Sequence, residues 1–151
     1  IWQGENFDCV FNKVYSSETQ GNKVSFNMSS SGISRLPFFK YTLNYEFFAD
    51  GSVKTGLCGD IRENVIWLPR LGFELALPLT DGKFKYFGNG PLESYRDMTH
   101  HGVIGVHSSD AGSEYVNYVR PQEHGNHTDC KWLEVSDKLR GEAEDKMEIC
   151  V

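Results

Sequence analysis

Two short segments of this 151-residue chain concentrate the side chains that could do chemistry. The first covers residues 86–97 and contains the run GNGP at 88–91, which predicts a sharp turn because glycine accepts backbone angles that other residues avoid. The second covers residues 118–129, where a predicted strand ends at Pro121 and a polar loop follows. Polar loops on a rigid scaffold often carry function. The candidate pocket or interdomain residues are Asn89, Glu93, Tyr95, Arg96, Asp97, Gln122, Glu123, His124 and Asn126.

The second segment has residue types that could bind a metal ion. His124, His127 and Asp129 are possible ligands, although the loop would have to curl to aim all three at one ion. Surface histidines are the simpler interpretation. The chain has no Gly-x-Ser-x-Gly elbow and no glycine-rich loop opening a helix, so nucleophilic catalysis and phosphate binding lack support.

Glycoside hydrolysis needs two carboxyl groups that face each other across the bond to be cleaved. The two segments offer four acidic residues, and their spacing does not show that any two converge: Glu93, Asp97, Glu123 and Asp129. The sequence instead predicts that Arg96 forms a local salt-bridge and turn network with Glu93 and Asp97. A structural role for the segments therefore stands beside a chemical one.

The elements that must position these segments are strands, because apolar residues recur with a period of two almost everywhere. Val24, Phe26 and Met28 show this alternation, and Asp50-Gly51 and Asp81-Gly82 predict tight turns between strands. Residues 16–22 and 29–35 are predicted to be polar connectors. The predicted strands cover residues 7–14, 24–28, 41–47, 53–57, 73–77, 84–86, 103–107, 114–120, 130–136 and 145–151.

This pattern predicts an all-β fold in which one domain covers residues 1–151. About nine short strands with turn signals between them are typical of an antiparallel β-sandwich. No window carries an apolar stripe at helical spacing long enough for a packed helix. The fold class is therefore all-β, antiparallel.

Composition narrows the range of partners. With 15 Lys+Arg against 21 Asp+Glu, the formal charge is −6, so electrostatics disfavour nucleic-acid binding. Apolar runs are only a few residues long, so no membrane-spanning segment is predicted. The cysteines are evenly spread without a C-x-x-C pair, which favours reduced thiols and a bacterial cytoplasmic location. They are Cys9, Cys58, Cys130 and Cys150.

Four ordered motifs resemble a known family. They are LPRLG at 68–72, YFGNGPLESYRD at 86–97, YVRPQEHGN at 118–126, and Lys131-Trp132. In this order and spacing the chain resembles the C-terminal domain of the large β-galactosidases of glycoside hydrolase family two. The likeness covers most of residues 1–14 and 40–151, whereas the family's Trp-Arg-x-x-x-Asp-Asn segment has no counterpart between Tyr15 and Lys40.

The resemblance implies a galactose-mutarotase-like supersandwich whose family version continues beyond Val151. It implies that the parent enzyme, an oligomer, hydrolyses terminal β-D-galactosides such as lactose with retention. In the family the catalytic carboxylates, and the Mg and Na ligands beside them, belong to a separate (β/α)-barrel. The resemblance therefore implies no catalytic residue, metal ligand or cofactor in this chain, which would pack on that barrel and help wall its active site.

A second hypothesis is a free-standing carbohydrate-binding module or an aldose-epimerase relative. An epimerase needs a general acid and a general base on one sheet face, for which His107, His124 and Glu123 are candidates. Sugar binding would use exposed aromatic rings against the pyranose of a galactoside. The candidates are Trp2, Trp67 and Trp132, although their apolar neighbours favour a place in the core.

Overall fold

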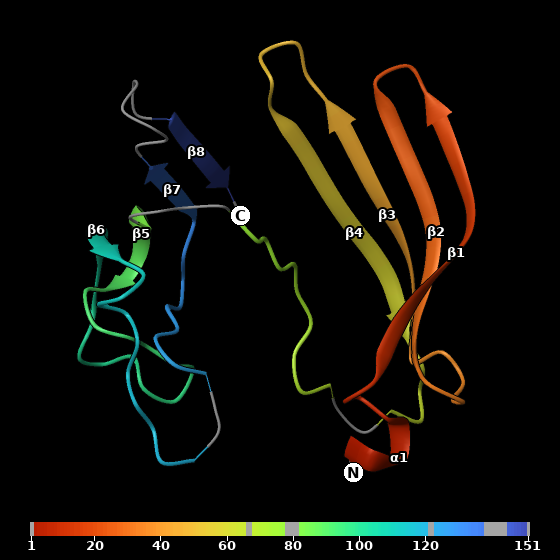
Figure 1. The fold of residues 1–151 in the computed structure, drawn as a ribbon, viewed down its shortest axis with the longest axis horizontal. Coiled ribbons are helices and arrows are strands. Elements are labelled where there is room, and N and C mark those ends of the chain that lie inside the picture. The colour runs from red at the N-terminus through yellow and green to blue at the C-terminus, as the bar shows by residue number, and fades with distance from the viewer. Residues whose placement is uncertain (1, 66–67, 78–81, 121–122, 138–144, 151) are drawn as a thin grey trace. The chain divides into compact units, whose positions relative to one another are not determined.

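The computed structural model describes residues 2–65, 68–77, 82–120, 123–137 and 145–150 (Figure 1). The chain divides into two compact units, Ile1–Phe73 and Glu74–Val151. One short helix and eight strands are found among the described residues: α1 (Trp2–Glu5), β1 (Val10–Gln20), β2 (Lys23–Gly32), β3 (Phe39–Phe47), β4 (Val53–Ile61), β5 (Lys83–Gly90), β6 (Val103–Asp110), β7 (Trp132–Asp137) and β8 (Asp145–Cys150).

The first unit is one antiparallel sheet in the order β1-β2-β3-β4, with each strand beside its neighbour in sequence (Figure 1). The register aligns Phe26 with Leu43 and Leu43 with Leu57, so one face of the sheet is apolar. On the other face the Ser25 hydroxyl donates to Asn44 Oδ1 at 2.6 Å. The two faces differ because successive side chains of a strand point to opposite sides.

The best-buried apolar side chains of this unit lie where β3 begins. Phe38 and Phe39 are buried, Phe7 meets Phe38 edge-on at 5.0 Å between ring centroids, and Phe39 stacks on Tyr41 at 4.7 Å. These aromatic contacts add to the stabilisation from burial. The core of the unit is therefore aromatic and lies at one end of the sheet.

The predicted connectors at 16–22 and 29–35 are wrong, because β1 and β2 run through most of both segments. Ser29 is 1% exposed, and its hydroxyl lies 3.0 Å from the Tyr15 hydroxyl. The buried Ser30 donates to Asn12 Oδ1 at 2.6 Å. A polar run can form a strand when the neighbouring strand supplies hydrogen-bond partners for it. Residues 10–32 thus form the β1–β2 hairpin.

The hairpin predicted at Asp50-Gly51 is confirmed. Phe47 pairs with Val53 as the last pair of β3 and β4, and Gly51 has φ +88°. Asp50 Oδ1 accepts from the Ser52 amide at 2.9 Å. Glycine is favoured here because a side chain rarely adopts a positive φ.

The second unit is an antiparallel sheet in the order β6-β5-β7-β8. Its centre is β5, where Tyr86 is 2% exposed and Gly88 and Asn89 are also buried. A Cβ at Gly88 would lie 2.8 Å from the Cys130 sulfur, so glycine lets the incoming chain approach β5 closely. Val135 on β7 completes the buried apolar set.

Two predicted strands are wrong: residues 73–77 and 114–120 form no strand. The hairpin predicted at Asp81-Gly82 therefore lacks its first strand. Asp81 lies outside the described residues. The Gly82 carbonyl oxygen accepts a hydrogen bond from the Ala111 amide, beyond the end of β6. Residues 114–120 alternate in polarity, but their polar groups bind loop residues rather than a neighbouring strand, as described below.

The predicted all-β, antiparallel class is confirmed, since two four-stranded antiparallel sheets are the elements of which a β-sandwich is built. The single-domain prediction stays a prediction. The four cysteines are free thiols. Among the described residues, no helix has the length and apolar character needed to cross a membrane.

Replacing Phe39 by alanine tests the aromatic core of the first unit. We expect Phe39→Ala to lower the free energy of unfolding by about 3–5 kcal/mol, because a buried ring leaves a cavity. The control is Phe47→Ala on the same strand and face; its ring is 48% exposed, so the loss is smaller. Urea unfolding followed by circular dichroism measures both, and equal losses would contradict this account.

Candidate functional site

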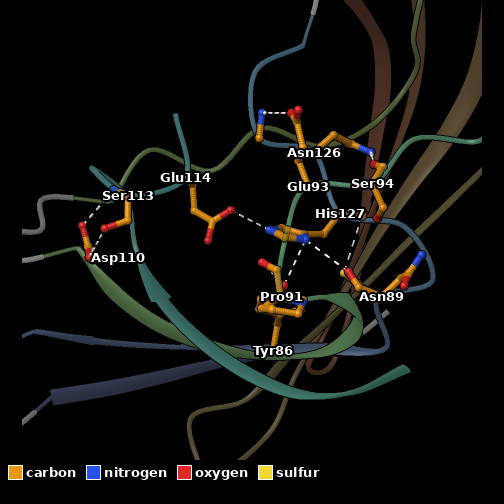
Figure 2. A network of polar contacts seen from close by, with 12 residues as sticks. Tyr86, Asn89, Pro91, Glu93, Ser94, Asp110, Ser113, Glu114, Asn126 and His127 are labelled. Carbon is orange, nitrogen blue, oxygen red and sulfur yellow. Dashed lines mark hydrogen bonds and ion pairs between the residues drawn. The ribbon is translucent and has the colours of Figure 1, made fainter. Parts of the chain in front are cut away.

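The carboxylate of Glu93 joins the two polar segments (Figure 2). Oε1 accepts a hydrogen bond from the Tyr118 hydroxyl, and Oε2 lies 3.0 Å from the Tyr95 hydroxyl and 3.2 Å from the Gly125 amide. The Tyr95 hydroxyl also lies 2.8 Å from the Glu123 carbonyl oxygen. Both carboxylate oxygens of Glu93 are therefore occupied, mainly by donors from the second segment.

These hydrogen bonds set the charge state of Glu93. Burial works to raise the pKa of its carboxyl, but hydrogen bonds from Tyr118 and two further donors outweigh burial and leave the pKa below its usual range. The same contact raises the pKa of Tyr118 to about 12, because the phenol donates to an anionic acceptor. Glu93 is thus an ionised acceptor and Tyr118 a neutral donor near neutral pH.

A second set of hydrogen bonds runs parallel to the Glu93 contacts. The Ser94 amide donates to the Asn126 carbonyl oxygen at 2.6 Å, and Asn126 Nδ2 returns a bond of 2.8 Å to the Ser94 carbonyl oxygen. The Ser94 hydroxyl, fully buried, accepts from the Thr128 amide at 2.9 Å. Asn126 therefore pairs with the backbone at Ser94 much as a strand neighbour would, and the two segments are held along their length.

His127 links the second polar segment to Tyr86 and Asn89 of β5 (Figure 2). Its Nε2 lies 2.7 Å from Glu114 Oε2, with side chains only 10% and 16% exposed. Its Nδ1 lies 3.0 Å from the Tyr86 hydroxyl and 3.2 Å from the Asn89 carbonyl oxygen. Burial, with a smaller contribution from the Glu114 charge, raises the pKa of Tyr86 to about 12, so Tyr86 remains a neutral phenol.

The two loop histidines have separate partners. His124 Nδ1 lies 2.5 Å from the Val116 carbonyl oxygen, and its ring stacks on Tyr115 at 4.9 Å, whereas His127 faces Glu114. Among the residues that the structure describes, no group of three or more His, Cys, Asp or Glu side chains is placed to hold a metal ion. The metal set considered from the sequence is therefore not assembled there.

The structure joins many of the predicted site residues. Glu93, Tyr95 and Asn126 bind across the two segments; Asn89 contacts His127 through its carbonyl oxygen and also donates from Nδ2 to the Thr99 carbonyl oxygen at 3.2 Å. The contacts of two further site residues with the same loops were described above; these are Glu123 and His124.

Two predicted site residues stay outside the network. Arg96 and Asp97 are exposed, and within the described part of the chain their side chains form no hydrogen bond or ion pair. The salt-bridge network predicted for Arg96 is therefore wrong, because Glu93 binds neutral donors instead. Gln122 lies outside the described residues.

Sequence reasoning missed Tyr118, Tyr86 and Glu114 as contributors to the site. Tyr86 and Tyr118 stood at the starts of the two polar segments but were not selected as site residues, and Glu114 fell in a segment interpreted as a strand. The available signal was composition, since tyrosine hydroxyls inside a protein require hydrogen-bond partners and acidic residues lay nearby in both segments.

Residues of the alternative hypotheses are spread over the unit. His107 lies on β6 with Nε2 2.9 Å from the Val103 carbonyl oxygen, and His124 lies in the second loop. Trp132 is half-buried on β7, Trp67 is outside the described residues, and Trp2 belongs to α1 in the other unit. The imidazoles of His107 and His124 thus bind the carbonyl oxygens of different segments.

Comparison with known proteins gives a consistent picture. The family model of the β-galactosidase small chain matches residues 1–149. A β-galactosidase of Actinobacillus pleuropneumoniae is 29% identical over 87% of this chain, and one of Arthrobacter sp. (strain B7) is 42% identical over 51%. A β-galactosidase of Lactobacillus delbrueckii subsp. bulgaricus is 33% identical over 66%. The chain spans 14%, 8% and 10% of these three relatives.

The hydrogen bonds of the Glu93 carboxylate with Tyr95, Tyr118 and Gly125 are called the Glu93 junction below. Replacing Glu93 by glutamine tests the contribution of this junction to stability at neutral and acidic pH. The folded-state pKa lies below the ordinary value of 4.5, so the stability from Glu93 is complete above that pH and is lost as pH falls through the lower folded-state pKa. We expect Glu93→Gln to destabilise the chain by on the order of 1 kcal/mol at pH 7, with the difference shrinking below pH 4.5.

Urea unfolding at several pH values measures this difference. The control is Asp97→Asn, which removes an exposed carboxylate from the same segment and should change stability little. If Glu93→Gln retained the full stability of the parent chain at pH 7, the Glu93 junction would contribute nothing to the free energy of unfolding.

Replacing Tyr86 by phenylalanine tests the contact between the Tyr86 hydroxyl and His127 at alkaline pH. The pKa of Tyr86 is raised from 10.0 to about 12, so its contribution is complete below pH 10 and is lost as pH rises through about 12. We expect Tyr86→Phe to be less stable at pH 8 and to lose less stability between pH 10 and 12. Phenolate absorbance and unfolding measured together check this, and an unchanged alkaline loss would contradict it.

Proposed function

The chain belongs to the β-galactosidase small-chain family, and we propose that it serves as a non-catalytic domain of a β-galactosidase. The observation that carries this proposal is the state of Glu93. A retaining glycosidase needs one carboxyl as a general acid, with a raised pKa, and a second as a free nucleophile. Glu93 is ionised, and both its oxygens accept hydrogen bonds within the chain.

Other carboxyls support the same conclusion. Among the described residues, every carboxyl whose pKa departs clearly from its ordinary value is shifted downward: Asp50, Glu93 and Asp110. A lowered pKa favours an acceptor that orders backbone and side chains, as Asp110 does for the Ser113 amide at 3.0 Å. Hydrolysis of terminal β-D-galactosides, with retention, is proposed to occur on a separate barrel domain with its own Mg and Na ligands, as the resemblance of the sequence motifs implies.

The two joined loops are proposed to pack on that barrel and to help wall its active site. Large apolar side chains on and beside them are exposed, and such exposure commonly marks an interaction surface. They include Leu92, Tyr115 and Val119. Hydrogen bonds inside the loops fix their shape, so the surface offered to a barrel would be preformed. Supersandwich packing, an oligomeric parent and a bacterial cytoplasmic location, in line with four free thiols, belong to the same proposal.

An assay of the purified 151-residue chain tests the non-catalytic assignment. Produced in a host without its own β-galactosidase, the chain should not hydrolyse a chromogenic β-galactoside, and calorimetric titration with galactose should give no binding heat. Hydrolysis would overturn the proposal. Galactose binding without hydrolysis would instead favour the carbohydrate-binding module.

A further inference from the structure

The strand β6 leaves one edge of the second sheet open. Its eight residues pair with β5 in continuous register from Val103↔Gly90 to Asp110↔Lys83, without a bulge. Among the described residues β6 has no other strand partner, and the sheet order β6-β5-β7-β8 places it at the end. An edge strand presents unpaired backbone donors and acceptors to any further strand.

The side chains of β6 favour pairing of this edge with a further strand. Val103, Ile104 and Val106 are 68%, 53% and 61% exposed, and they lie on both faces of the strand. The only charged residue of β6 is Asp110, at its end. Apolar edge strands with neither a bulge nor a charge along most of their length are where chains associate.

The other edge strands carry features that oppose pairing. β1 contains Lys13 and Glu18 and is interrupted by a bulge between Val14 and Ser16. β4 contains Lys54 and Asp60, and β8 contains Glu148. Charged side chains and bulges are the usual protection of edge strands. β6 is therefore the one unprotected edge among the described strands.

We propose that β6 pairs antiparallel with β6 of a second copy of this chain, which joins the two second-unit sheets into one continuous sheet. The occupant is a second copy because the strand is complementary to itself. A two-fold axis at Val106 would place Val106 opposite its own counterpart and Ile104 opposite Ser108. The bulky His107 would face Gly105, and Asp110 would face Gly102, so no like charges oppose each other.

The geometry of the strand supports this register. The Ala111 amide donates to the Gly82 carbonyl oxygen, so in this register the odd-numbered residues of β6 bond to β5, and Ile104, Val106 and Ser108 direct their backbone groups to the open edge. An interface built from one strand and its symmetric copy is closed, so it yields a dimer and not a fibre. The inference concerns the open edge of β6 and does not depend on the proposed function.

Sedimentation velocity of the 151-residue chain over a range of concentrations tests the proposal. We expect a species of twice the 17.1 kDa chain mass at high concentration. Val106→Lys should shift it to the single-chain mass, because two lysines would then face each other across the axis. Since Val106 is largely exposed, the variant should retain the circular dichroism of the parent chain.

The matched control is Val53→Lys on β4, an exposed valine on the edge of the other sheet, which should leave the dimer intact. Hydrogen exchange supplies a measurement that needs no variant: amides of residues 104–108 should exchange more slowly as concentration rises. A single-chain mass at all concentrations, equal dissociation by both substitutions, or association beyond the dimer would each overturn the proposal.

Discussion

A half-buried carboxylate, that of Glu93, is the constraint on which the arrangement of the second unit depends. A charge removed from water is costly unless hydrogen bonds replace its hydration. The donors here come from Tyr95, Tyr118 and Gly125, and two of the three belong to a segment more than twenty residues further along the chain. Satisfying one charge therefore fixes the path of a whole loop, and the contacts of Ser94 and His127 extend that path to β5.

In the first unit, too, hydrogen bonds within the protein replace contacts with water, but there the polar groups are neutral. Its polar face is held by hydroxyl and amide pairs between strands, such as Ser25 with Asn44 and Thr42 with Asn27. Its apolar face collects the aromatic side chains that stack around Phe39. Each face is thus stable for its own reason, and together they make a strand of a serine run that would otherwise resemble a connector.

The proposed non-catalytic role rests on where the hydrogen-bonding capacity of the second unit is used. Around Glu93 and Ser94, polar side chains such as Asn126 bind one another and the backbone, while apolar side chains of the same unit such as Val119 and Val106 are exposed. This is the reverse of an exposed catalytic centre, where polar groups must remain free for the substrate. A domain of this kind is suited to presenting a fixed surface to another chain or domain.

The sequence by itself determined the fold class, most of the strands and the two segments that meet. Alternation such as that of Val24, Phe26 and Met28 is local, because a strand's side chains alternate by geometry, and Asp50-Gly51 is a local turn signal. Only the tertiary structure decided that residues 114–120 are a loop, that Tyr118 binds Glu93 and that Arg96 does not. Those outcomes depend on partners distant in sequence. The period of one segment carries no information about which distant group will hydrogen-bond to its polar side chains.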